Sequence, residues 1–149
     1  MFQIFQKIKE KKFSEVSNHD KAILISSMMV ECAKIDDSFA EKEKKLIIDI
    51  LIKKLHLTES EAMDCFDKSI KASEQSVEIY SLTKDIRDNF SKEEILIIFE
   101  YLWQIILSDN IIDDFEASMM TKLTGLFHLT GKESAEAKRN AKILLNIDI

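Results

Sequence analysis

The sequence contains no proline and only two glycines, Gly125 and Gly131, among its 149 residues. Hairpins and β-sandwiches place these residues at their turns, so the composition argues against a mainly β fold. Cysteine is also scarce. Cys32 and Cys65 both lie within helical patterns, and we expect two buried, reduced thiols instead of a disulfide framework.

Long apolar runs and an excess of positive charge are missing as well. The apolar run 95–99 ends at Glu100, far short of the roughly 20 residues that span a bilayer. Lys7, Lys9 and Glu10 interrupt the N-terminal stretch, so we expect no cleavable signal sequence and a cytoplasmic location. The formal net charge of -6 argues against a nucleic-acid partner, because phosphate recognition needs clustered lysine and arginine.

The chain does contain hydrophobic residues at three- and four-residue spacing along nearly its whole length, which predicts helices. Three capping-box signatures mark helix starts: Thr58 with Glu61, Ser91 with Glu94, and Thr130 with Glu133. The predicted helices cover residues of about 2–12, 18–33, 41–55, 59–73, 77–89, 92–105, 114–127 and 131–145. We therefore predict an all-α fold of about seven to eight helices, with one compact domain at 18–149 and an N-terminal amphipathic helix or extension at 1–17.

The second half of this helical pattern repeats the first. The offset is 73 positions, the separation of Asp36 from Asp109, and it slips by one residue after the acidic segments. The matched pairs are Asn18 and Ser91, Asp20 and Glu93, Ile25 and Ile98, Met29 and Leu102, Leu46 and Met119, Ile50 and Leu123, and His56 and His128. Two pseudo-repeated halves that share one core are the expected arrangement, because a lone helical hairpin cannot bury both its faces.

Each half carries one acidic turn between two predicted helices. Asp36 stands seven residues before Glu43, and Asp109 stands seven residues before Glu116. Asp113 has the position of an N-cap, with Glu116 three residues later, so capping accounts for these two acids. It accounts less readily for Asp109, because an acid at a helix C-terminus meets the negative end of the dipole.

Two interpretations of the acidic turns stay open from the residues alone. Paired carboxylates supply hard oxygen ligands for Ca²⁺, Mg²⁺ or Mn²⁺. The same acids are also typical of well-capped helix ends. The turns are not EF-hands, because Ile47 and Met120 occupy the twelfth loop positions where glutamate is required. The cysteines and histidines show no zinc-ligand spacing.

Several motifs occur in an order that is similar to a known family. Residues 33–36 are Ala-Lys-Ile-Asp and are followed by Glu43, and residues 107–116 are Leu-Ser-Asp-Asn-Ile-Ile-Asp-Asp-Phe-Glu. Between them lie Ile-Tyr-Ser-Leu-Thr at 79–83 and a Ser-Lys-Glu-Glu segment that leads to Trp103. Over residues of about 18–140, the chain resembles the TerB-like domain of the tellurite-resistance TerB family.

The resemblance implies an all-helical fold of two related halves and acidic residues that bind a divalent metal. It also implies association with bacterial stress resistance and membrane-associated complexes, without an established enzymatic activity. Asp36, Glu43, Asp109, Asp113 and Glu116 match the acidic pattern of the family.

The chain departs from the family pattern at a few positions. Asp37 and Asn110 stand where glycine is usual. Ala40 stands where a capping side chain is usual, and this missing cap weakens the prediction of a metal site at the first acidic turn. His56 and His128 stand where many members have glycine, which predicts left-handed helix ends. We expect His19, in a first helical turn, to be solvated.

We therefore expect a non-enzymatic domain that binds a divalent cation and engages a protein partner. The alternative is a purely structural or adaptor domain whose acids only cap helices. Alternating hydrophobic and lysine residues at 1–13 predict either packing onto the domain or contact with an anionic membrane surface, without spanning it.

Overall fold

The computed structural model describes residues 18–36, 41–75, 78–109 and 112–146, with the side chains of Asn18, Asp36 and Asp109 left out. The elements are α1 (Asn18–Ala33), η2 (Lys34–Asp36), α2 (Glu41–Lys53), α3 (Glu59–Glu74), α4 (Ile79–Asn89), α5 (Lys92–Ile106), η3 (Leu107–Asp109), α6 (Asp114–Leu126) and α7 (Gly131–Leu144). These ranges contain seven α-helices, two short 3-10 helices and no strand, which confirms the all-α prediction. The predicted helix at 2–12 lies outside the described residues, so the division into 1–17 and 18–149 stays a prediction.

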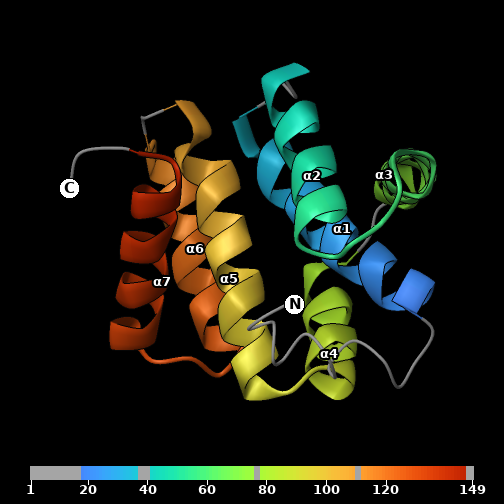
Figure 1. Cartoon of the computed structure of the whole chain (residues 1–149). Coiled ribbons are helices and arrows are strands. Elements are labelled where there is room, and N and C mark those ends of the chain that lie inside the picture. Colours follow the sequence, from blue (N-terminus) through green and yellow to red (C-terminus); the bar gives the residue numbers. More distant parts are fainter. Residues whose placement is uncertain (1–17, 37–40, 76–77, 110–111, 147–149) are drawn as a thin grey trace.

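The duplication predicted from the sequence is present in the order of the helices (Figure 1). The series α1, η2, α2, α3 is repeated as α5, η3, α6, α7, and α4 lies between the two series. The 3-10 helices η2 and η3 fall at equivalent places, immediately before the acidic turns. The sequence predicted these turns but not their 3-10 geometry.

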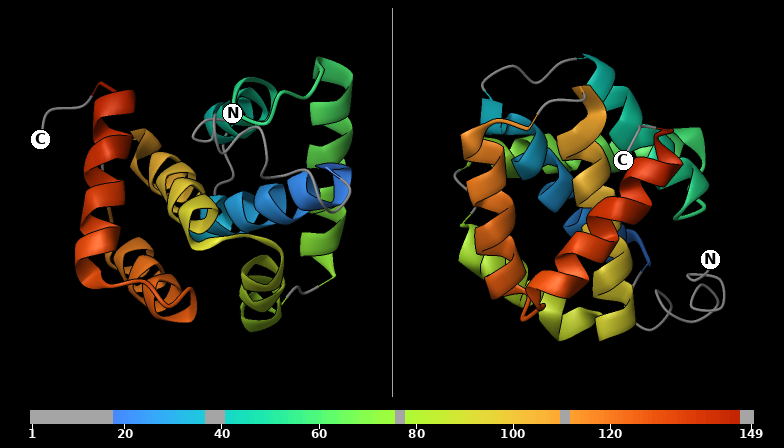
Figure 2. Two further views of the ribbon diagram at one scale, coloured as in Figure 1. Left: turned by 60° about the horizontal axis from the view of Figure 1, so that its bottom comes forward. Right: turned by 90° about the vertical axis from the view of Figure 1, so that its left-hand side faces the viewer.

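The two equivalent helices α1 and α5 pack against each other at the centre of the molecule. Helix α3 packs on α1, and α7 packs on α5, so that α1 and α5 lie between α3 and α7 (Figure 2, left). Helix α2 contacts α1, α3 and α5, whereas α4 contacts α1, α5 and α6. The repeated halves therefore share one core, as predicted.

Repeat-equivalent residues fill this core from both halves. Met29 and Leu102 are both fully buried, and so are Ile25 and Ile98. Phe99 adds an edge-to-face contact with Phe127, with ring centroids 6.0 Å apart. Burial of such side chains stabilises each by about 1.5–3 kcal/mol relative to exposure, so the α1–α5 contact is a main source of stability.

Candidate metal centre at the acidic turns

The second acidic turn is closed by a capping box at the start of α6. The Asp113 Oδ1 atom accepts a hydrogen bond from the Glu116 backbone N–H at 2.8 Å, and Glu116 Oε1 accepts one from the Asp113 backbone N–H at 3.2 Å. Asp113 is exposed, whereas Glu116 is only 5% exposed. The predicted cap is confirmed, and the Glu116 carboxylate that takes part in it is buried in the protein.

The first acidic turn repeats the buried carboxylate. Glu43 lies in the first turn of α2, at the place that Glu116 has in α6, and it is 7% exposed. Residues 37–40 lie outside the described part of the chain, and so does the side chain of Asp36. A buried carboxylate at the third position of the helix is thus common to both halves.

The fold brings the end of the first half against the start of the second acidic helix. The 3-10 helix η2 packs against α6, and the right-hand view of Figure 2 shows the blue η2 beside the orange start of α6. The electrostatics agree: burial raises the pKa of the Cys32 thiol, and the neighbouring Glu31 and Glu116 carboxylates raise it further. The Glu116 carboxylate therefore lies close to the end of α1, which belongs to the other half.

A polar network joins the end of α1 and η2 to α3. Lys34 Nζ donates a hydrogen bond to Ser73 Oγ and lies 3.8 Å from Glu31 Oε2, while Ser73 Oγ donates to Glu31 Oε2 at 2.8 Å. The residues equivalent to Glu31 and Lys34 in the second half are Gln104 and Leu107. Sequence reasoning missed this network, although the Glu31–Lys34 spacing of three residues is typical of a helical ion pair.

The comparison with protein families agrees with this architecture. A family model described as tellurite resistance protein TerB matches residues 22–139. The chain belongs to the TerB family. No curated protein and no solved structure gives a significant match.

Three of the five residues that match the TerB acidic pattern have described side chains: Glu43, Asp113 and Glu116. Asp36 and Asp109, the first acid of each turn, contribute backbone to η2 and η3 only. Among the side chains that the structure describes, no group of three or more His, Cys, Asp or Glu residues is arranged to hold a metal ion.

The histidines of this TerB domain divide into two kinds. His56 and His128 have a φ of 59° each, which confirms the left-handed helix ends predicted for them. His19 is not simply solvated, because its ring contacts Lys68 and Asp64 of α3. The His19 side chain is still 42% exposed, so it is solvated as expected, and only its contacts were missed because the partners lie 45 or more residues away in the sequence.

The remaining sequence predictions concern the thiols and the membrane. Cys32 and Cys65 are free and buried, as expected, and burial raises the pKa of Cys65 to about 11. Both thiols are therefore poor nucleophiles.

Within the described ranges, no helix has both the length and the apolar character needed to cross a bilayer.

Proposed function

We propose that this TerB-family chain is a non-enzymatic cytoplasmic domain that binds Ca²⁺, Mg²⁺ or Mn²⁺ at its paired acidic turns. Asp36, Glu43, Asp109, Asp113 and Glu116 are the proposed ligands. The packing of η2 against α6 is the observation that carries the proposal, because it brings the start of the first acidic turn next to the helix that closes the second.

The burial of both glutamates supports this proposal. An ionised carboxylate loses several kcal/mol of hydration in a protein interior unless hydrogen bonds or an opposite charge compensate it. Glu43 and Glu116 are both buried, and each also makes further polar or electrostatic contacts within the protein. In this proposal a hard divalent cation adds to that compensation, because Ca²⁺, Mg²⁺ and Mn²⁺ prefer carboxylate oxygens as ligands.

The structural alternative has its own supporting observation. The Asp113–Glu116 capping box has the same geometry as the box of Thr58 and Glu61, where no acidic turn precedes the helix. Capping alone thus accounts for Asp113 and for one oxygen of Glu116.

Glu116→Gln separates cation binding from helix capping, because glutamine also serves at the third position of a capping box. Thermal unfolding of chelator-treated protein would be compared with and without each cation. We expect wild type to gain about 2.7 kcal/mol at a cation concentration one hundred times the dissociation constant. Glu116→Gln combined with Asp109→Asn should fold but lose this gain.

Glu61→Gln is the matched control, since it removes a capping carboxylate at a turn without paired acids. It should keep the full response to the cation. Failure of every cation to stabilise wild type would sink the proposal and leave capping as the role of these acids.

The same end of the molecule carries the surface that we propose for a protein partner in a stress-response or membrane-associated complex. Phe115, directly after the exposed acids Asp113 and Asp114, is 76% exposed. An exposed aromatic ring beside carboxylates fits a partner with an apolar pocket and basic groups around it. A photo-crosslinker at position 115 should capture such a partner in cells, and one at the exposed Thr121 should not.

A further inference from the structure

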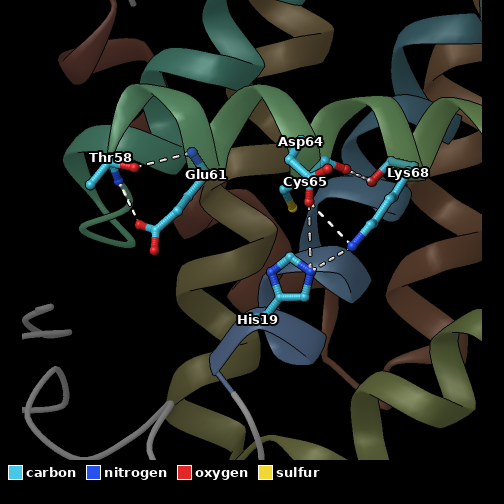
Figure 3. A network of polar contacts seen from close by, with 7 residues as sticks. His19, Thr58, Glu61, Asp64, Cys65 and Lys68 are labelled. Atoms are coloured by element: carbon cyan, nitrogen blue, oxygen red, sulfur yellow. Dashed lines mark hydrogen bonds and ion pairs between the residues drawn. The ribbon is translucent and has the colours of Figure 1, made fainter.

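The first turn of α1 is tied to α3 by a network of three ionisable side chains (Figure 3). The His19 Nε2 atom lies 3.1 Å from Lys68 Nζ and 3.9 Å from Asp64 Oδ2. Lys68 Nζ also lies 3.2 Å from Asp64 Oδ2. All three side chains are about half exposed, so solvent protons reach them freely.

The contact with Lys68 depends on the tautomer of the His19 ring. A lysine ammonium has three N–H donors and no acceptor, so Nε2 must accept the hydrogen bond. This contact requires a ring that carries its proton on Nδ1 and leaves Nε2 unprotonated. Imidazoles gain a second proton between about pH 5 and 8, and here that proton would have to enter at Nε2.

Protonation removes the acceptor that Lys68 uses and places two cations 3.1 Å apart. Among the described residues, Asp64 is the carboxylate that lies next to both of them, and in this structure it pairs with Lys68. A protonated Nε2–H would instead donate to Asp64, and Lys68, on its flexible four-carbon chain, would turn to solvent.

The second half of the chain has a lysine in place of the histidine. Lys92 is the repeat equivalent of His19, and its Nζ lies 2.9 Å from Glu133 Oε2 in the first turn of α7. A Lys–Glu pair keeps its charges throughout the range in which an imidazole titrates. The Lys92–Glu133 pair between α5 and α7 therefore serves as an internal control for the pH response of the α1–α3 contact.

We propose that His19 makes the α1–α3 contact a pH-sensitive junction, in which protonation of Nε2 exchanges Lys68 for Asp64 as the partner of the ring. Within the described residues, Lys68 and Asp64 of α3 are the polar partners of the ring, and α2, α4, α5 and η2 contribute none. Glu61, one turn earlier on α3, caps its own helix through the Thr58 N–H. On α1 itself, the neighbouring charges are Asp20, which is exposed, and Lys21, which lies over the Phe90 ring.

Nitrogen-15 NMR of the full chain tests the proposed tautomer of the His19 ring. At pH 8 we expect the His19 Nδ1–H tautomer, with Nε2 unprotonated. Lys68→Met removes the donor and should move the ring toward the Nε2–H tautomer. An Nε2–H ring in wild type, or a tautomer that Lys68→Met leaves unchanged, would overturn the proposal.

Carbon-13 NMR of the side chains tests the exchange of partners. Between pH 8 and 5, the signals of Asp64 Cγ and Lys68 Cε should move together with the His19 ring, whereas Lys92 and Glu133 should stay constant. His19→Gln keeps an acceptor for Lys68 but does not titrate, so the movement should vanish in that variant. Persistence of the movement in His19→Gln, or its absence in wild type, contradicts the exchange.

Discussion

His56 and His128 adopt the same left-handed backbone conformation, with a φ of 59° at each, and they occupy equivalent places in the two halves. His128 follows the end of α6, where its N–H donates to the Gly125 carbonyl at 3.0 Å and the Leu129 N–H donates to the Thr124 carbonyl at 2.9 Å. This is a Schellman ending, which glycine normally completes. A β-carbon in that conformation costs about 1–2 kcal/mol.

Replacing His128 by glycine should therefore stabilise the protein. We expect His128→Gly to be more stable than His128→Ala by about 1 kcal/mol, because only the glycine removes the strain of the β-carbon. Urea denaturation of the two variants measures the difference directly. Equal stability would show that the left-handed ending carries no strain.

The contact between the central helices α1 and α5 should dominate the stability of the fold. Leu102 is fully buried there, and we expect Leu102→Ala to cost about 2–5 kcal/mol because it leaves a cavity. Leu144, 54% exposed on α7, is the matched control, and Leu144→Ala should change stability by less than about 0.5 kcal/mol. Similar losses for both variants in urea denaturation would contradict this assignment of the core.

Glu100 should make the stability depend on pH. Burial raises the pKa of Glu100 above its ordinary value of 4.5, although a hydrogen bond from Asn140 and the charge of Lys54 act in the opposite direction. The folded state thus binds the proton more tightly than the unfolded chain. The free energy of unfolding falls as the pH rises from about 4.5 through the raised pKa.

Glu100→Gln removes this dependence and keeps an acceptor for the Asn140 amide. Relative to wild type, the variant should gain stability between pH 4 and 7, as followed by urea denaturation across that range. Glu93→Gln, an exposed position on the same helix, should show no such gain. A constant difference between Glu100→Gln and wild type over this pH range would refute the linkage.

The buried thiols should react only after unfolding. With a pKa of about 11, roughly one Cys65 thiol in several thousand is ionised at pH 7.5, and the native fold buries it as well. We expect a thiol reagent to label Cys32 and Cys65 at the rate of unfolding, and to label both at once in guanidinium. Rapid labelling of the native protein would show that the contacts around α3 open on their own.

Local features of the fold were well predicted from the sequence. The predicted boundaries of the helices at 41–55 and 114–127 differ from those of α2 and α6 by two residues or fewer, because apolar spacing and capping boxes act within one or two turns. The left-handed ends at His56 and His128 were also correct. The 3-10 geometry of η2 and η3 was not predicted, since it depends on how each helix end packs.

The candidate site was predicted only in part. The capping roles of Asp113 and Glu116 follow from a spacing of three residues, so they were visible in the sequence. The network of Lys34 with Ser73 joins residues 39 positions apart, and the contact of His19 with Lys68 joins residues 49 apart. Sequence spacing carries no information about such pairs, because their distance is set by how the helices cross.

The sequence by itself determined an all-α fold of two repeated halves, with an acidic turn in each, because helical periodicity, caps and repeats are local properties of the chain. Only the tertiary structure decided that η2 of the first half meets α6 of the second, and that Glu43 and Glu116 are both buried. That outcome depends on the packing of α1 against α5, which couples residues from opposite halves through the shared core.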